Sequence, residues 1–209
     1  MRRIAHRAVV AAVLAHASVA SAAHHQWIIS EVFSNADGTV QFVELLGTAN
    51  NESSLNGFTV NTSPAGTTGL IATSVPLGPN LTSSLTAGAY LLLGTAGYAA
   101  LAAQQGAPAP DRVLPDNFLE IAADTVRYAG IPSTDIVYTN LPTNGIDSLD
   151  LENPSGTVNT PENFAKATGS IDASPAAVPT LGAGAILALA ALLLGIGLIF
   201  RLRHPPKIA

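Results

Sequence analysis

The chain has no cysteine, and it has very little positive charge over most of its length. Without cysteine it can form neither a disulfide nor a thiolate-ligated zinc site, so thiol chemistry is excluded. A chain of 209 residues is long enough to bury a hydrophobic core without such cross-links. The fold must therefore depend on apolar packing and hydrogen bonds.

Basic residues are scarce where acidic residues are abundant. All 14 acidic residues lie between Glu31 and Asp172, and only Arg112, Arg127 and Lys166 oppose them there. The formal charge of this middle part is 3 − 14 = −11. Such a surface repels phosphate groups, so we expect no nucleic-acid partner. It would attract divalent cations or basic partners, or it would simply keep the protein in solution.

One long apolar run stands near the C-terminus. Residues Leu181–Phe200 form a stretch of 20 residues without a charged side chain. At about 1.5 Å per residue a helix of this length spans about 30 Å, the thickness of a bilayer's hydrocarbon core. Arg201 and Arg203 follow directly, and basic residues favour the cytoplasmic side. The pattern predicts a transmembrane helix with a basic stop.

The N-terminus has the features of an export signal. Arg2, Arg3 and Arg7 precede a short apolar stretch, Ala8–Ala20, and small residues follow it. This order is typical of a secretory signal peptide, although a buried N-terminal helix is the alternative. We therefore expect cleavage near Ala23 and a mature part that lies outside the cytoplasm.

The middle of the chain is punctuated by turns between short apolar or alternating segments. Their β-branched and aromatic residues predict seven or eight strands, and hence an all-β sandwich. The expected strands, besides a weak one at Leu70–Thr73, are Gln26–Phe33, Val40–Leu46, Gly57–Asn61, Leu85–Leu93, Phe118–Tyr128, Ile136–Asn140 and Ser148–Glu152, with a short helix at Tyr98–Gln105. The expected organisation is a signal peptide (1–23), the sandwich (24–167), a flexible spacer (168–177), a sorting motif with the transmembrane helix and its basic stop (178–203), and a cytoplasmic tail (204–209).

Several of these segments together resemble the lamin-tail domain. The strand Ile28–Phe33, the strand Gln41–Leu45 and the segment Leu55–Val60 follow that family's opening pattern, with Phe58 in place of its usual tryptophan. Leu85–Leu93 is similar to its "L-x-P-G-x-Y" strand, although alanine replaces the proline. Ser148–Leu151 matches its "L-x-L" strand. The resemblance implies an immunoglobulin-like sandwich of binding or structural type.

The C-terminal part carries a second resemblance. Val178, Pro179, Thr180 and Leu181, followed by the apolar run and a basic end, resemble the IPTL-type relatives of the PEP-CTERM sorting signals. The resemblance implies recognition by an exosortase-like membrane enzyme in a Gram-negative bacterium. The chain departs from the pattern at Gly182–Gly184 and in the residues after Arg203. A permanent membrane anchor is the alternative.

Two carboxylates are the candidates for chemistry. Glu31 and Glu44 fall on the first two expected strands, and an antiparallel pairing would place them side by side. Paired carboxylates serve general acid and base catalysis, so a hydrolase would require a concave pocket around both. The competing interpretation is that each carboxylate accepts hydrogen bonds from backbone amides or lies in solvent.

Calcium is the one cofactor that the sequence leaves as a candidate. Asp147, Asp150 and Glu152 cluster near two asparagines, and calcium prefers such oxygen ligands. The spacing matches no EF-hand loop, and Asp147 is out of register with the other two along a strand. We therefore assign no metal site and keep these three residues as calcium candidates.

These patterns favour an exported, surface-anchored or matrix-associated module without catalytic activity. Its expected partners are the membrane, an exosortase-like processing enzyme, and an extracellular polymer or surface protein. The alternatives are a calcium-dependent adhesin-like module, a subunit of a surface filament, and a hydrolase that uses Glu31 and Glu44.

Overall fold

The computed structural model describes residues 26–64, 72–129, 135–150 and 156–175. They form ten strands and one helix. In chain order these are β1 (Trp27–Ser34), β2 (Gln41–Gly47), β3 (Thr59–Pro64), β4 (Thr73–Pro76), β5 (Tyr90–Gly94), α1 (Ala96–Gln105), β6 (Arg112–Val113), β7 (Asp124–Tyr128), β8 (Ile136–Tyr138), β9 (Asp147–Asp150) and β10 (Thr157–Val158).

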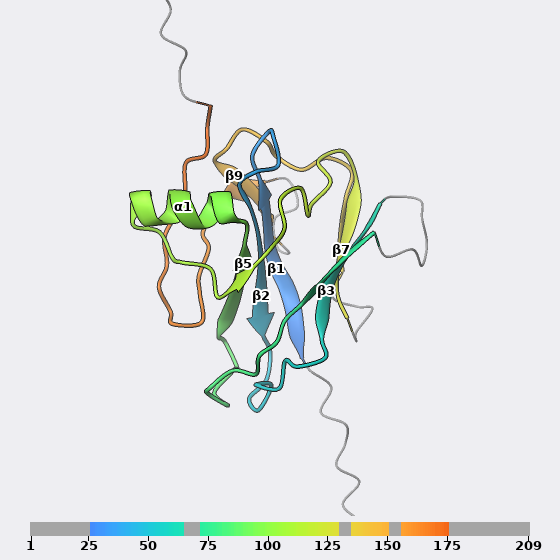
Figure 1. Ribbon diagram of the computed structural model, residues 1–209, viewed down its shortest axis with the longest axis vertical. Helices are drawn as coiled ribbons and strands as arrows, with labels where there is room; N and C mark the ends of the chain where they lie inside the picture. The colour runs from blue at the N-terminus through green and yellow to red at the C-terminus, as the bar shows by residue number, and fades with distance from the viewer. Residues whose placement is uncertain (1–25, 65–71, 130–134, 151–155, 176–209) are drawn as a thin grey trace, which may run out of the picture. The chain divides into compact units, whose positions relative to one another are not determined.

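The strands form two sheets that pack as a β-sandwich. One sheet has the order β10-β9-β1-β2-β5-β6, and the other has the order β4-β3-β7-β8. All neighbours are antiparallel except β5 and β6, which are parallel and are joined through α1. In Figure 1 the six-stranded sheet stands at the centre, with β3 and β7 on its right and α1 on its left. The prediction of an all-β sandwich is confirmed.

The first hairpin follows the sequence pattern closely. β1 pairs with β2 from Trp27–Gly47 to Ser34–Gln41. Gly38 supplies the positive φ that the turn between them needs, at +72°, and the Asp37 side chain accepts a hydrogen bond from the Thr39 amide. Turn residues and alternating apolar residues therefore define this element locally.

Other elements differ from the sequence prediction. Only the second half of Phe118–Tyr128 is a strand, because Phe118 and Leu119 lie in a loop whose apolar side chains fill the core. The strand β4 begins at Thr73, the last residue of the weak strand expected at Leu70–Thr73, whereas Leu70 and Ile71 lie outside the described residues. The two-residue strands β6 and β10 were not expected, since pairs this short leave no periodic pattern.

The main core lies between the two sheets. Trp27, Ile29 and Leu91 of the six-stranded sheet are completely buried there, and so are Val60 and Val126 of the four-stranded sheet. Burial of apolar side chains of this size stabilises the fold by roughly 1.5–3 kcal/mol each. Packing in this core fixes the positions of the strands β1 and β2, which carry the candidate site on their other face.

A second, smaller cluster covers the outer face of the six-stranded sheet. Phe33, Phe42 and Leu92 pack there against Tyr98 of α1. The Thr95 side chain accepts a hydrogen bond from the Tyr98 amide at the start of the helix. Gly106 ends the helix in the left-handed conformation, with φ at +72°. The central strands are thus buried on both faces.

Residues 159–174, which we call the strap, cover the rest of this outer face. Figure 1 shows the segment in orange beside α1 and β5. Ile171 is buried in the outer cluster, and the Ala173 amide donates to the Gly145 carbonyl. The compact unit therefore extends through Ser174, beyond the expected boundary at Ala167. Most of the expected spacer 168–177 is thus attached to the domain, because Ile171 and Ala173 pack on the outer cluster and their amides are hydrogen-bonded.

Within the described residues, no helix is both long enough and apolar enough to cross a membrane. The expected signal peptide and the expected transmembrane run Leu181–Phe200 lie outside those residues.

Candidate functional site

The candidate site begins with an irregularity in β1. Ile29 pairs with Leu45 but Glu31 pairs with Glu44, so Ser30 is an extra residue in β1. Such a β-bulge reverses the alternation of side chains along a strand. Ile29 and Val32 both enter the main core, and the bulge places Ser30 and Glu31 on the outer face between them.

Acidic residues lie opposite one another on neighbouring strands beside the bulge. Glu31 is opposite Glu44 of β2 on one side and opposite Asp150 of β9 on the other. Glu31 and Glu44 each have an exposed fraction of only 3%. The sequence prediction that these two glutamates form a cross-strand pair is correct, and both of them are covered by the strap.

Glu31 is held by β9 and the strap. Its Oε1 accepts hydrogen bonds from the Ser148 hydroxyl and, at 3.0 Å, from the Thr160 amide. The Thr160 hydroxyl lies 3.4 Å from Oε2. The carboxylate therefore links β1 to β9 and to the strap, which lie 117 and 129 residues further along the chain at the bonded positions.

Glu44 makes the corresponding contacts one strand further along the sheet. Its Oε1 accepts a hydrogen bond of 2.6 Å from the Ser30 hydroxyl. Its Oε2 accepts one of 2.6 Å from the Glu162 amide. The bulge residue and the strap thus share this carboxylate.

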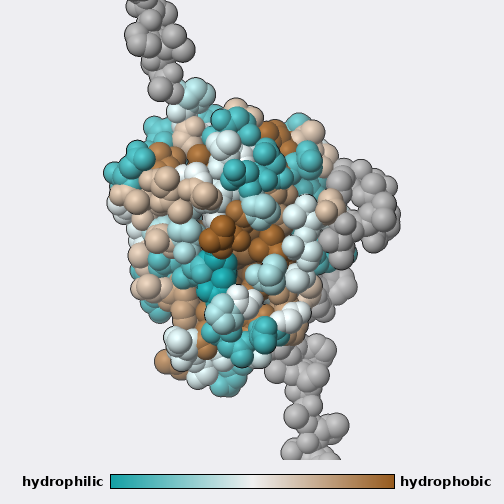
Figure 2. All heavy atoms as spheres, in the orientation of Figure 1, coloured by the Kyte–Doolittle hydropathy of each residue, from teal (hydrophilic) through white to brown (hydrophobic). Residues whose placement is uncertain are grey.

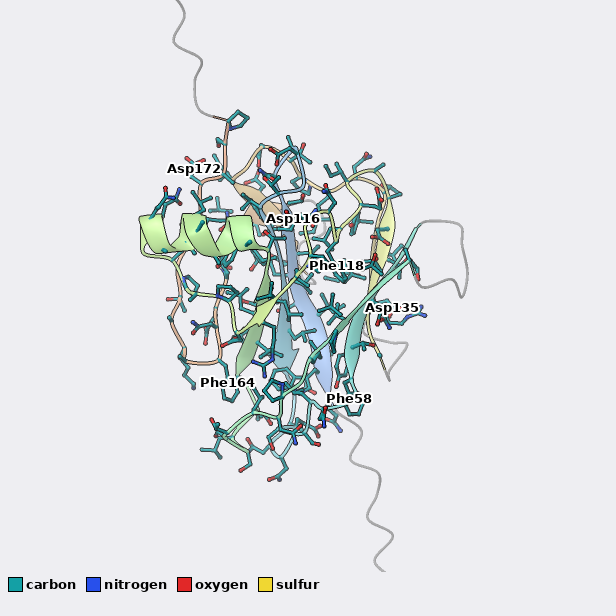
Figure 3. All side chains as sticks on the ribbon, viewed as in Figure 1. Phe58, Asp116, Phe118, Asp135, Phe164 and Asp172 are labelled. Carbon is teal, nitrogen blue, oxygen red and sulfur yellow. The ribbon has the colours of Figure 1, made fainter. Side chains whose placement is uncertain are left out.

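A third carboxylate continues the series. Asp111 Oδ2 accepts hydrogen bonds of 2.9 Å from the amides of Leu92 and Phe164. The strap therefore donates three alternate amides, from Thr160, Glu162 and Phe164, to three different carboxylates. Because β1, β2 and β5 are neighbours, the strap crosses the strands rather than pairing with one. Figure 3 shows Phe164 low beside the sheet and Asp172 near α1.

Burial is the main cause of the pKa shifts of Glu31 and Glu44. Loss of solvent raises the pKa of Glu44 to about 8, and the nearby charges of Glu31 and Glu162 act in the same direction. Burial also raises the pKa of Glu31, with a further contribution from Asp150. The hydrogen bonds from Ser30 and from the Glu162 amide oppose the shift of Glu44 but do not cancel it.

Two hollows open beside the glutamate pair. A cavity of about 310 Å³ includes Ser30, Glu31, Glu44 and Asp150 in its lining. A second hollow of about 560 Å³ shares Glu44 with it and extends along the strap to Ser170. Both glutamates therefore line one cavity, although only a small part of each side chain is exposed to it.

The calcium candidates do not form a site in the part of the chain that is described. Asp147 and Asp150 are three residues apart on β9, so their side chains leave the strand on opposite faces. Asp147 accepts a hydrogen bond from the Asn144 side chain instead. Glu152 lies outside the described residues. Among the described residues, no group of three or more acidic or histidine side chains is arranged to hold a metal ion.

The residues expected to direct sorting are not placed. Val178, Pro179, Thr180 and Leu181, and the basic stop at Arg201 and Arg203, lie outside the described ranges. Their roles remain predictions from the sequence.

Sequence reasoning missed Asp111 and Asn159. Asn159 is fully buried, donates to the carbonyls of Ile146 and Ile171, and accepts from the Ile171 amide at 2.8 Å. Asp111 follows a proline-rich stretch and carries no local motif. Each acts on a segment more than ten residues away, and no spacing rule in a single sequence reports such contacts.

Comparisons with known proteins identify no relative. No family model matches the chain, and neither the curated proteins nor the solved structures contain a match.

Proposed function

We propose that the chain is an exported module of structural or interaction type, held at a membrane or delivered from it to the cell surface or matrix. The observation that carries this proposal is the arrangement of a leader-like N-terminus, a compact acidic β-sandwich, and an apolar run with a basic end. The lamin-tail and sorting-signal resemblances support the same function.

The use of the buried carboxylates favours a structural role over catalysis. Glu31, Glu44 and Asp111 all accept backbone amides of the strap. A carboxylate that must take or give a proton to a substrate needs an oxygen available to it, whereas both oxygens of Glu31 and of Glu44 already accept hydrogen bonds from backbone amides or hydroxyl groups of the protein itself. Their first effect is to attach the strap to the sheet.

The surface argues against the filament alternative. The outermost strands of the two sheets, β10, β6, β4 and β8, contain two to four residues each. Such short edges offer few hydrogen bonds to a neighbouring copy. Figure 2 shows polar side chains next to a central hydrophobic area, with smaller hydrophobic areas near the edges of this face. We therefore favour binding of a separate polymer or protein over self-assembly.

Mass spectrometry of both termini, on protein from fractionated cells, tests the proposal. We expect a mature chain that begins near His24 in a membrane, surface or extracellular fraction. A C-terminus near Val178 would support sorting with cleavage, whereas retention of Ala209 in the membrane would support a permanent anchor and contradict the sorting signal. An intact leader in the cytosolic fraction would contradict export. A variant with Arg201 and Arg203 replaced by glutamine tests the basic stop.

A hydrolase is the second candidate, because both glutamates line the same cavity and the raised pKa of Glu44 suits a general acid near neutral pH. Purified protein would be assayed against a panel of glycosides and peptides, in parallel with the Glu31→Gln variant. Turnover that this substitution abolishes, in a variant with an unchanged circular dichroism spectrum, would establish the candidate. Equal turnover in both proteins, or none in either, would reject it.

A further inference from the structure

The strap joins the sheet through an unusual set of partners. Along its first part, its amides bind carboxylates that belong to β1, to β2 and to the turn before β6. Two of these carboxylates, Glu31 and Glu44, are opposite each other and almost fully buried. Closure of the strap is therefore coupled to the burial of two neighbouring acidic groups.

Ionisation of both carboxylates is energetically unfavourable, because they are adjacent and almost fully buried. Cross-strand partners have Cβ atoms about 4.5–5.5 Å apart, and repulsion at this separation is strong where water is excluded. The titratable groups that face the pair are also acidic or neutral: Asp150 from β9, Glu162 from the strap, Tyr98 from α1 and Tyr90 from β5. Arg112 acts on Asp111. A proton shared within the pair relieves the repulsion.

Protonation of Glu44 does not remove any of its hydrogen bonds. A hydroxyl group can donate or accept, so Ser30 can accept from a protonated Glu44 Oε1 instead of donating to it. Glu44 Oε2 still receives the Glu162 amide. The contact that holds the strap is thus compatible with the neutral form of Glu44, whereas the ionised form adds a buried charge.

We propose that the strap is a proton-dependent latch, which closes while the Glu31–Glu44 pair holds a proton and opens locally as the pH rises past neutral. Opening exposes the three carboxylates, Glu31, Glu44 and Asp111, and the hollow beside the glutamate pair. Opening becomes more favourable as the pH rises from the ordinary pKa of glutamate, 4.5, towards the raised pKa of Glu44, about 8. The latch concerns only the described domain and does not depend on how the chain is anchored.

Proteolysis after Lys166 tests the opening, because the Lys166 side chain is exposed but the backbone around it is hydrogen-bonded to Asn163 and must open before a protease can bind it in an extended form. Lys166 lies in the strap, and the only other lysine in the chain is Lys207. A lysine-specific protease would be added to the purified full chain at pH 6.5 and 8.5, and cleavage after Lys166 followed by mass spectrometry. A synthetic peptide of residues 162–170 corrects for the pH dependence of the protease. Cleavage of a locally opened segment reports the open population when reclosing is fast.

We expect the corrected rate to rise about tenfold between the two pH values, because release of one proton changes an equilibrium by up to tenfold per pH unit. Glu44→Gln keeps the carbonyl acceptor and removes the charge, so its corrected rate should be nearly independent of pH. Asp116→Asn removes one exposed acidic charge elsewhere and should keep the full rise. An equal rise in the wild type and in Glu44→Gln, or no rise in the wild type, would overturn the latch.

Hydrogen exchange of the unmodified protein gives a test that needs no variant. After correction for intrinsic rates, the amides of Thr160, Glu162 and Phe164 should lose protection between pH 6.5 and 8.5. The Leu45 amide in β2 should stay protected, because the opening is local. Parallel loss of protection at Leu45 would mean global unfolding and would contradict the latch.

Discussion

The two faces of the six-stranded sheet are covered in different ways. The inner face packs against a second sheet through apolar side chains such as Trp27, Ile29 and Leu91. The outer face is covered by α1 over a small aromatic cluster and by the strap over a row of carboxylates. The same strands therefore carry a hydrophobic interface on one side and a largely polar, hydrogen-bonded one on the other.

This difference separates the contacts that determine stability from those that can respond to conditions. Apolar burial on the inner face does not depend on pH or on a single partner. The outer face depends on the protonation of Glu31 and Glu44 and on backbone amides that reach them from the strap. We expect the inner face to provide most of the stability of the fold. We expect the outer face to make that stability depend on pH.

Removal of a large inner side chain should have the greatest effect. Trp27 is completely buried, and its indole donates a 3.0 Å hydrogen bond to the Glu52 carbonyl. Trp27→Ala should lower the free energy of unfolding by about 3–5 kcal/mol, by the same amount at pH 5 and at pH 8. Urea denaturation at both pH values checks this. A loss that differed greatly between them would contradict the independence of the inner face from the carboxylates on the outer face.

The pH dependence of the wild type should be the next largest effect. Unfolded Glu44 has its ordinary pKa of 4.5, whereas the folded protein holds its proton up to about pH 8. Below pH 4.5 both states are protonated, so the folded state pays no penalty. Between these values the folded state binds the extra proton, so the free energy of unfolding falls as the pH rises.

We expect a loss of about 2–4 kcal/mol between pH 5 and pH 8, to which Glu31 contributes in the same direction. Denaturation curves of the wild type and of Glu44→Gln across this range check it. The variant should lose less and should exceed the wild type in stability at pH 8. Identical slopes would show that Glu44 is not the responsible group.

Removal of the buried Asn159 side chain should lower the free energy of unfolding slightly less than Trp27→Ala or the change in pH. Asn159→Ala removes both donors and the acceptor that pair with the Ile146 and Ile171 backbone. Unsatisfied buried groups of this kind cost roughly 1–3 kcal/mol each, so we expect about 2–3 kcal/mol after partial rearrangement. Thermal unfolding measures the loss, and Asn140→Ala at an exposed position is the matched control. Equal stability of the two variants would show that the strap contributes nothing.

The smallest effect should come from an exposed ion pair. The Arg127 guanidinium contacts both oxygens of Asp135, with the shortest distance 2.6 Å, but its side chain is 44% exposed. Arg127→Ala should cost about 0.2–1 kcal/mol at low salt and less at 1 M salt, because ions screen exposed charges. A larger loss that high salt did not reduce would point to a packing role for the arginine stem.

Local patterns were enough to predict the first hairpin, the helix and the sandwich architecture. Alternating apolar residues and the turn at Asp37–Gly38 define β1 and β2, and the alanine-rich segment before Gly106 forms α1. These features act between neighbours in the chain, so a single sequence records them. The cross-strand pairing of Glu31 with Glu44 also follows from the hairpin.

The sequence by itself determined the hydrophobic strands, the turn positions, the acidic middle and the apolar run near the C-terminus. Only the tertiary structure decided the bulge at Ser30, the attachment of the strap, and the roles of Asp111 and Asn159. The physical reason is the distance along the chain. The bulge and the strap are stabilised by hydrogen bonds between segments as much as 129 residues apart, and such contacts leave no periodic signal in the segments that make them.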